Sequence, residues 1–455
     1  MRNALLLLFS CVFYHENTSR SSATEMENTM EGMKRPWLTV FGVAVTLFVA
    51  SAARPALALP TFAQAYKVDC SACHTMVPAL NAYGRYIQST GFGALDPDVM
   101  RHTLPLVYRE SITARSTGKL NRLSPNEKIT SANLSLNLVG VLNKYVSYRF
   151  EQTLYSNNLG GGNTGHFWVA YNGLFNGNGH LLVGKFDAPA PPAFSYWSDM
   201  SGFSSGGMTV GQHTYNISGS RWGVGLNYVP TNYEHMPYKL QMAYVGNSPP
   251  MYNGSVWSSS NPYADHQNGS DKAFQYKLAW ARPDNPVEGG VYGAFGTYIL
   301  GSGYTDPIDR YNALGFYVQR DPVRGVPGMM LFYQRTNDSN VGPGKAGQHL
   351  TQSASGWSYA FELDESLANG NVMLGFRPVE YVSGLVPSKS GYDVVRTAHP
   401  HYGVFDIALR DPKISPYLYL TAESALGAAS NAQFGIPTWR MAIRWAAPIG
   451  GPAAP

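Results

Sequence analysis

Five consecutive residues have types and spacing that can bind a redox cofactor covalently: Cys70, Ser71, Ala72, Cys73 and His74. The pattern C-x-x-C-H is the attachment site of c-type haem. Its two thiols add across the two vinyl groups of one porphyrin, and the histidine becomes the proximal ligand of the iron. The sequence therefore predicts one haem c, bound by Cys70 and Cys73 with His74 as axial ligand, and a role in electron transfer.

The second axial ligand of the iron is left open by the sequence. Met76 follows His74 too closely to reach the opposite face of a porphyrin. Met100 and His102 lie far enough along the chain to fold back, and each is a candidate. A residue of the remaining chain such as His166, or no protein ligand, is the alternative. A methionine ligand would raise the reduction potential relative to a second histidine.

The segment before the motif has the features of an export signal. A basic start at Met33 precedes an apolar run over residues 37–53, and Ala56 and Ala58 fit the small-x-small cleavage rule. We therefore assign residues 1–58 to a signal peptide region, with Met33 as the expected true start. A lipoprotein signal ending at Cys11 is the alternative, although it leaves a very short apolar region. Because haem c is attached outside the bacterial cytoplasm, signal and motif agree.

Residues 59–103 carry the motif and are too few to build a core around a porphyrin alone. Pro78 predicts the start of a helix and Gly91 its end. Leu80, Tyr83 and Ile87 fall on one side at helical spacing, and that face would cover either the porphyrin or the wall of a larger domain. Arg85 could pair with a haem propionate, and a solvated arginine is the alternative. We expect this segment to be a small α-helical haem c plug.

The composition of the chain is typical of an outer-membrane β-barrel. Charged residues make up 14% and aromatic residues 13% of the sequence, whereas about 25% charged residues is usual. The mature region has no apolar run long enough for a transmembrane helix. The net charge of +4 is small and scattered, so no nucleic-acid partner is expected.

Apolar and polar residues alternate along many short segments. In residues 273–281, for example, the apolar set is Phe274, Tyr276, Leu278 and Trp280, and the other set is Gln275, Lys277 and Ala279. Such a period of two predicts strands with one apolar face. Lengths near ten residues, aromatic residues at strand ends and charges within strands favour lipid outside and a wet lumen inside. A soluble β-sandwich or propeller is the alternative.

Seventeen segments have this pattern, and single-chain bacterial barrels have even strand numbers. We therefore predict an all-β fold, an antiparallel barrel of about 16 strands over residues 104–446, with residues 447–455 as a tail and residues 188–207 as a loop folded inward. The segments begin near Leu104, Ile129, Lys144, His166, His180, Met208, Arg221, Tyr238, Lys272, Val287, Asp309, Gly328, Gly356, Asn371, His401, Tyr417 and Thr438.

Three stretches around the motif, residues 58–63, 70–75 and 78–85, resemble the fused monohaem cytochrome–porin family. That family includes the outer-membrane iron-oxidising cytochromes of Fe(II)-oxidising bacteria. The resemblance implies that Cys70 and Cys73 bind haem c and that His74 binds its iron. It also implies that electrons pass from an extracellular donor to a periplasmic c-type cytochrome.

Three functions follow from these observations. The chain could be an Fe(II):cytochrome c oxidoreductase, an extracellular electron conduit with another donor or acceptor, or a diffusion porin with a haem-bearing plug. Expected partners are extracellular Fe(II) or another donor, a periplasmic c-type cytochrome and outer-membrane lipid. Acidic residues near the extracellular mouth, such as Glu151, Asp364 and Glu423, could attract Fe²⁺; ordinary lumen polarity is the alternative.

Overall fold

The computed structural model describes residues 61–76, 79–101, 106–116, 127–156, 163–190, 207–210, 213–216, 220–246, 272–299, 308–323, 325–338, 354–368, 371–382, 386–388, 391–393, 403–410, 418–426 and 439–448. They belong to one compact unit, Ala56–Pro455, which is distinct from Met1–Pro55. The predicted signal region and residues 449–455 of the predicted tail lie outside the described residues.

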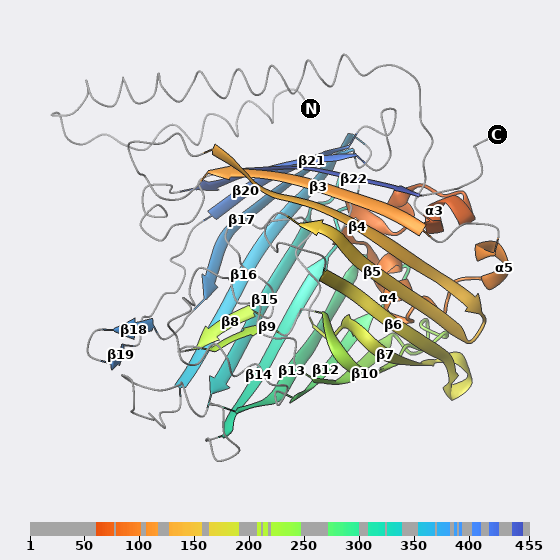
Figure 1. The fold of residues 1–455 in the computed structure, drawn as a ribbon, viewed down its shortest axis with the longest axis horizontal. Helices are drawn as coiled ribbons and strands as arrows, with labels where there is room; N and C mark the ends of the chain where they lie inside the picture. The colour runs from red at the N-terminus through yellow and green to blue at the C-terminus, as the bar shows by residue number, and fades with distance from the viewer. Residues whose placement is uncertain are drawn as a thin grey trace. The chain divides into compact units, whose positions relative to one another are not determined.

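Sixteen antiparallel strands close into one barrel (Figure 1). Each strand pairs with its neighbour along the chain, and the last strand returns to the first, with Ile443 opposite Ile112. The strands are β3 (Leu106–Ser116), β4 (Glu127–Asn143), β5 (Val146–Ser156), β6 (Asn163–Leu174), β7 (Gly179–Asp187), β10 (Ser220–Tyr228), β11 (Tyr238–Gly246), β12 (Lys272–Ala281), β13 (Val287–Ile299), β14 (Ile308–Arg320), β15 (Gly328–Asp338), β16 (Ala354–Leu367), β17 (Val372–Val382), β20 (Gly403–Arg410), β21 (Tyr419–Leu426) and β22 (Trp439–Pro448). The predicted barrel of about 16 strands is confirmed.

The predicted strand near Met208 does not belong to the barrel. It forms β8 (Gly207–Val210), which pairs only with β9 (His213–Asn216) among the described strands. A second small hairpin pairs β18 (Val386–Ser388) with β19 (Gly391–Asp393). β8 contacts β16, on the far side of the barrel from the β7 strand that precedes it. This contact agrees with a segment that turns inward after β7, although residues 191–206 of the predicted loop lie outside the described residues.

The two faces of the barrel strands differ in character, as β12 illustrates. Phe274 and Leu278 are exposed, whereas Gln275 and Lys277 between them are buried. The same holds in β22, where Ile443 is exposed beside the buried Ala442. Apolar side chains therefore face outward and polar ones face the interior, the reverse of a soluble β-sandwich and the pattern of a barrel in lipid.

The two ends of the barrel differ in the length of their connections. At one end, residues 144–145 join β4 to β5 and residues 282–286 join β12 to β13. At the other end, residues 247–271 join β11 to β12 and residues 339–353 join β15 to β16. Outer-membrane barrels have short periplasmic turns and longer extracellular loops. The short-turn end is therefore the periplasmic one.

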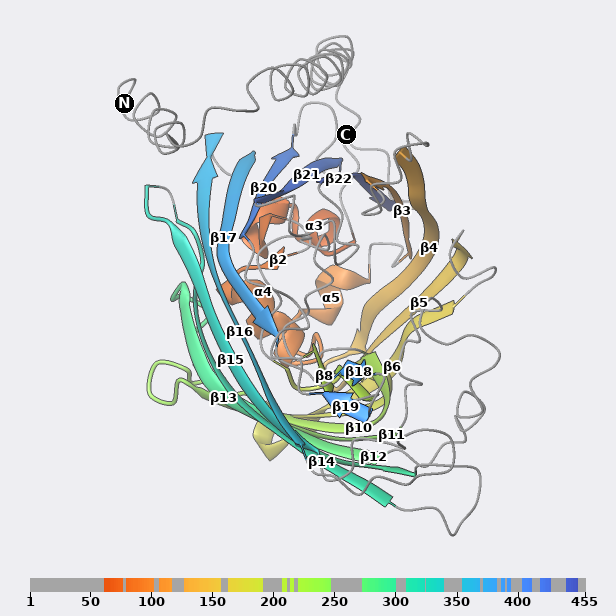
Figure 2. The ribbon, with the colours of Figure 1, turned by 90° about the vertical axis from the view of Figure 1, so that its left-hand side faces the viewer.

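The segment before β3 lies inside the ring of strands (Figure 2). It contains α3 (Thr61–Tyr66), η1 (Cys70–Ala72), β1 (His74–Met76), β2 (Ala79–Leu80), α4 (Ala82–Ser89) and α5 (Pro97–Met100). Another short helix, η2 (Phe175–Gly177), belongs to the turn between β6 and β7. The segment before β3 contacts wall residues near the short turns. The Ser147 hydroxyl donates to the Gly91 carbonyl, and the Asn227 amide donates to the Ser89 carbonyl over 2.8 Å.

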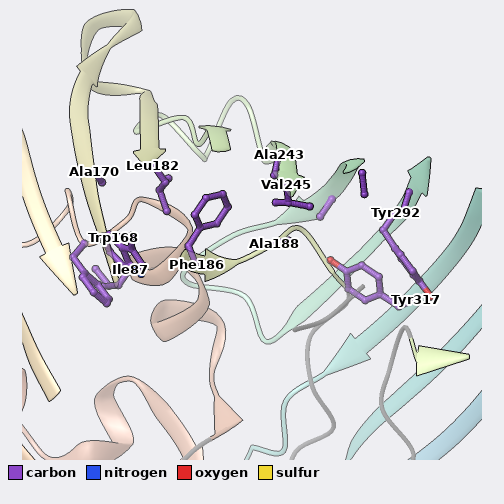
Figure 3. Close-up of a cluster of buried hydrophobic side chains, with 14 of the residues drawn as sticks. Ile87, Trp168, Ala170, Leu182, Phe186, Ala188, Ala243, Val245, Tyr292 and Tyr317 are labelled. Atoms are coloured by element: carbon purple, nitrogen blue, oxygen red, sulfur yellow. The ribbon is translucent and has the colours of Figure 1, made fainter. Parts of the chain in front are cut away.

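An apolar cluster joins this inner segment to the barrel wall (Figure 3). Ile87 and Phe92 pack with Trp168 and Leu182 of β6 and β7, and the Phe92 and Trp168 rings stack with centroids 5.3 Å apart. Of the predicted apolar face, Ile87 packs on the wall, whereas Tyr83 is 44% exposed and Leu80 lies in β2, before the helix. The helix itself begins at Ala82, because Asn81 caps it, and not at Pro78 as predicted. It ends as predicted, since Gly91 has a φ of +55°.

Candidate functional site

The C-x-x-C-H turn is held in shape by two polar side chains outside it. The Asp69 carboxylate accepts a 2.9 Å hydrogen bond from the Ser71 N–H and so caps η1. The Asn81 amide donates to the carbonyls of Ser71 and Ala72 over 2.9 and 3.1 Å. Asn81 also caps α4 through the Gly84 N–H, so one residue fixes both the turn and the helix after it.

The turn rests directly on the backbone of α4. A Cβ atom at position 84 would lie 2.0 Å from the carbonyl oxygen of Cys73, closer than any side chain could approach. The Asn81 N–H donates to that same carbonyl over 3.0 Å. Gly84 is therefore required for the close approach that positions Cys73 and His74.

A cleft beside the motif is lined both by residues of the motif region and by residues far away in the sequence. Its lining consists of Cys70, Ser71, His74, Thr75, Met76, Arg410 and Tyr419. The last two belong to β20 and β21 and face each other in register at the short-turn end. The barrel wall therefore completes a cleft that begins with the motif.

Cys70 is buried and Cys73 is partly buried. In the part of the chain that the structure describes, neither Cys70 nor Cys73 forms a disulfide. Burial raises the pKa of the Cys70 thiol to about 11 and raises that of Cys73 as well. Both are thus thiols rather than thiolates at neutral pH, so they suit a structural attachment better than redox exchange with a second cysteine.

An ion pair ties the motif to the wall. The Arg410 guanidinium lies 3.2 Å from the Asp69 carboxylate and also donates to Asn371. Burial opposes the ionisation of Asp69, but the Ser71 hydrogen bonds and the Arg410 charge outweigh this effect and hold the pKa of Asp69 below its usual value. The cleft therefore has a cationic edge on the barrel side, beside Cys70.

These residues fit a covalently bound haem c. Cys70 and Cys73 would hold it through thioethers and His74 would bind its iron, because all three lie on one turn and His74 faces the cleft with Cys70. Arg410 supplies a guanidinium at the cleft, the group that pairs best with a carboxylate such as a propionate. Met76 is buried against Met373, Ala408 and Tyr419 on the barrel side.

Arg85 lies away from this cleft, in a buried ionic cluster. Its Nε donates to Glu288 over 2.9 Å, and its two terminal nitrogens donate to Asp321 over 2.8 and 3.0 Å. Glu288 also lies 3.0 Å from the Lys239 ammonium. The cluster connects α4 to β13 and to the β14–β15 turn. The predicted propionate contact of Arg85 stays a prediction.

The candidate distal ligands are dispersed. Met100 is buried in the cluster around Phe92, and His102 lies outside the described residues. His166 stands near the long-loop end, where its two ring nitrogens each lie 2.9 Å from a carboxylate, of Glu151 and Asp187. The structure thus brings Cys70, Cys73 and His74 together, whereas the distal ligand stays a prediction.

The three acidic residues predicted near the extracellular mouth occupy different depths. Glu151 pairs with Arg109, Arg149 and His166, so cations already surround it. Asp364 lies only three positions before the short-turn end of β16, so its predicted place near the extracellular mouth is wrong. The reason is that β16 runs from the long loops toward the periplasm. Glu423 lies within β21, opposite Asp406.

Sequence reasoning did not find the wall residues Arg410 and Tyr419. Both lie more than 300 residues after the motif, and only the closure of the barrel brings them to it. Among the described residues, no three metal-ligating side chains are already gathered around one point, and no helix is both long and apolar enough to cross a membrane.

No protein-family model matches the chain, and no protein of curated function matches it. Solved structures do. OmpF of Salmonella typhi, in complex with daunomycin, is 11% identical with a TM-score of 0.47, and the match covers 75% of this chain and 96% of OmpF. OprB of Pseudomonas putida is 12% identical with a TM-score of 0.44, covering 75% and 93%. OmpT of Vibrio cholerae, an outer membrane protein in trimer form, is 10% identical with a TM-score of 0.45, covering 75% and 98%.

The cellular location follows from the barrel itself. Its strands close without an edge, its outer face is apolar and its inner face is polar. Only a closed barrel lets strands satisfy all backbone groups within lipid. Barrels with a polar interior, short turns and long loops are outer-membrane proteins. The chain is therefore a 16-stranded β-barrel protein of the bacterial outer membrane.

Proposed function

We propose that this protein carries electrons across the outer membrane, from an extracellular donor, Fe(II), through one haem c to a periplasmic c-type cytochrome. The observation that carries the proposal is the position of the C-x-x-C-H turn, fixed inside the barrel at its short-turn end. Haem c supplies a one-electron carrier when bound. As an enzyme, the protein would be an Fe(II):cytochrome c oxidoreductase.

The chain's own residues serve this role by position rather than by acid–base chemistry. Asn81 and Gly84 hold the motif against α4, and Arg410 and Tyr419 close the cleft from the wall. Because the motif lies toward the periplasm, a periplasmic partner can approach it from the short-turn end. An extracellular donor has to enter the lumen from the long-loop end, which keeps insoluble Fe(III) out of the periplasm.

Stopped-flow absorbance tests the proposal. The purified, haem-loaded protein in detergent is oxidised and mixed with Fe(II) without oxygen. The sharp band of reduced haem c should appear rapidly, and a Cys73→Ala variant should lack the covalent haem. Reduction by dithionite without any reduction by Fe(II) would rule out Fe(II) as the donor.

A diffusion porin with a haem-bearing plug is the second candidate. The closed barrel with buried lysine, arginine and glutamine side chains on its inner wall favours it, since a polar lumen is what solutes cross in porins. Conductance in planar bilayers separates the two. A stable open channel in the intact protein supports the porin, whereas current that appears only after deletion of residues 59–103 supports a lumen closed for diffusion.

A further inference from the structure

Three acidic side chains and one glycine form a row across the inner wall. Asp364 of β16 is paired with Gly375 of β17, Gly375 with Asp406 of β20, and Asp406 with Glu423 of β21. All four are buried and, being directly paired, share the inward face. The row thus spans four adjacent strands at one level of the barrel.

Gly375 leaves the space that the Asp406 carboxylate occupies. A Cβ atom at this position would lie 2.2 Å from Oδ1 and 2.8 Å from Oδ2 of Asp406. The Asp406 carboxylate therefore leans over Gly375, into the space that a larger residue would fill, and toward β16. Asp364 is paired with Gly375 on its other side, so the Asp406 carboxylate leans toward the strand that carries Asp364.

The Asp406 carboxyl group lacks hydrogen-bond partners in this arrangement of described strands. Asp406 is 2% exposed, and neither of its carboxylate oxygens accepts a hydrogen bond from any described residue. The nearest arginine on β17, Arg377, donates to the Glu362 carboxylate through both Nε (3.1 Å) and Nη2 (2.6 Å). A buried carboxylate without partners is costly, so a cationic ligand would stabilise it strongly.

We propose that Asp364 and Asp406 bind one hydrated divalent cation in the lumen, with Glu423 adding negative charge beside them. Carboxylate oxygens are preferred by hard divalent cations, which often bind through two carboxylates and keep several waters. The binding itself is independent of haem, but its identification as the Fe(II) donor site rests on the proposed function.

The position of the row suits such a donor site. Met373 and Ala408, which pack against Met76, precede Gly375 and follow Asp406 by two residues on their strands. Two residues of strand span about 7 Å, so the cation would be held one inward-facing level from the residues beside the C-x-x-C-H turn. Compared with Met373 and Ala408, the acidic row lies one inward-facing residue farther toward the extracellular end of the barrel.

Titration with Mn²⁺, followed by electron paramagnetic resonance of the free ion, tests the site in the full-length protein in detergent. The wild type should bind one Mn²⁺, and Asp406→Asn should weaken binding about tenfold or more. The matched control is Glu365→Gln, because Glu365 follows Asp364 on β16 and occupies the opposite face of the strand. If Asp406→Asn does not fold, Gly375→Ala serves instead, since its Cβ displaces the same carboxylate.

Each outcome decides the inference. No stoichiometric Mn²⁺ binding by the wild type, or equal binding by Asp406→Asn or Gly375→Ala, overturns it. Stopped-flow reduction by Fe(II) separates this failure from failure of the proposed function. Equal rates in wild type and Asp406→Asn would leave the function standing without this site. Asp406-dependent Mn²⁺ binding without any reduction by Fe(II) would leave a cation site and remove the iron donor.

Discussion

The Cys73 carbonyl is the point where the motif and α4 meet. It accepts a hydrogen bond from the Asn81 N–H, and Gly84 passes directly beneath it. A single methyl group at position 84 would occupy the place of that oxygen. At the scale of residues, the geometry of the motif therefore depends on one small residue outside it.

We expect Gly84→Ala to separate the turn from the helix. Overpacking of this kind costs about 1–3 kcal/mol. Thermal unfolding and the haem c content per polypeptide, from the pyridine haemochrome spectrum, should both fall. Gln88→Ala, at an exposed position of the same helix, is the control and should change neither. Full haem content with unchanged stability in Gly84→Ala would show that the turn does not need this contact.

α4 is attached to the barrel mainly by charge at one end and by apolar packing at the other. Arg85 joins it to Glu288 and Asp321, and the Ala82 N–H donates to Asp321 over 2.8 Å. At its C-terminal end, Ile87 packs against the wall. At the scale of elements, the helix is thus part of the barrel interior rather than a separate domain.

Arg85→Met should destabilise this attachment by about 3–5 kcal/mol, because it leaves the buried carboxylate of Asp321 without its cationic partner. Glu288 keeps Lys239, which limits the loss there. Denaturant unfolding in detergent measures the change. The exposed pair Arg101–Asp98 provides the control, and Arg101→Met should cost less than about 1 kcal/mol. Equal losses in the two variants would contradict a special role for the buried cluster.

The apolar belt is a property of the whole barrel. Leu314 lies at the middle of β14 and is 57% exposed, while its neighbour Ala313 is buried in the interior. Most outward side chains described on the other strands are also apolar, and Glu110 of β3, paired with the outward-facing Trp445, is an exception. At the scale of the molecule, this belt is what fixes the protein in lipid.

Leu314→Arg should therefore lower stability in a bilayer by about 2–4 kcal/mol, the cost of a cation at the midplane. Urea unfolding in lipid vesicles measures it, and Leu314→Phe, which keeps the surface apolar, is expected to be near neutral. A loss seen equally in both variants would point to packing rather than to lipid contact.

Much of this architecture can be predicted from the sequence. Each barrel strand has a period of two over about ten residues, and that signal is local, so all 16 strands were found. The surplus segment near Met208 has the same local pattern in a hairpin too short to span a membrane. The start of α4 was misplaced because a proline and an asparagine, Pro78 and Asn81, are both good helix-start signals.

The candidate site was predictable only where it is contiguous. The motif is five neighbouring residues, whereas Arg410 and Tyr419 become its neighbours through closure of the barrel. The depth of Asp364 depends on the direction in which β16 runs. Asp406 has no sequence signal, because its significance arises from Gly375 on the next strand. Only the register between β17 and β20 shows that Asp406 lies beside Gly375.

The wall that covers Cys70 comes from β20 and β21, among the last strands to leave the translocation machinery. Until those strands pair and β22 joins β3, this cysteine is open to other proteins; afterwards it is 5% exposed. An enzyme that modifies Cys70 must therefore act on the unassembled chain. For the proposed haem c, ligation of Cys70 would therefore precede insertion of the barrel, and a chain that closed first would have to unfold before this thiol could react.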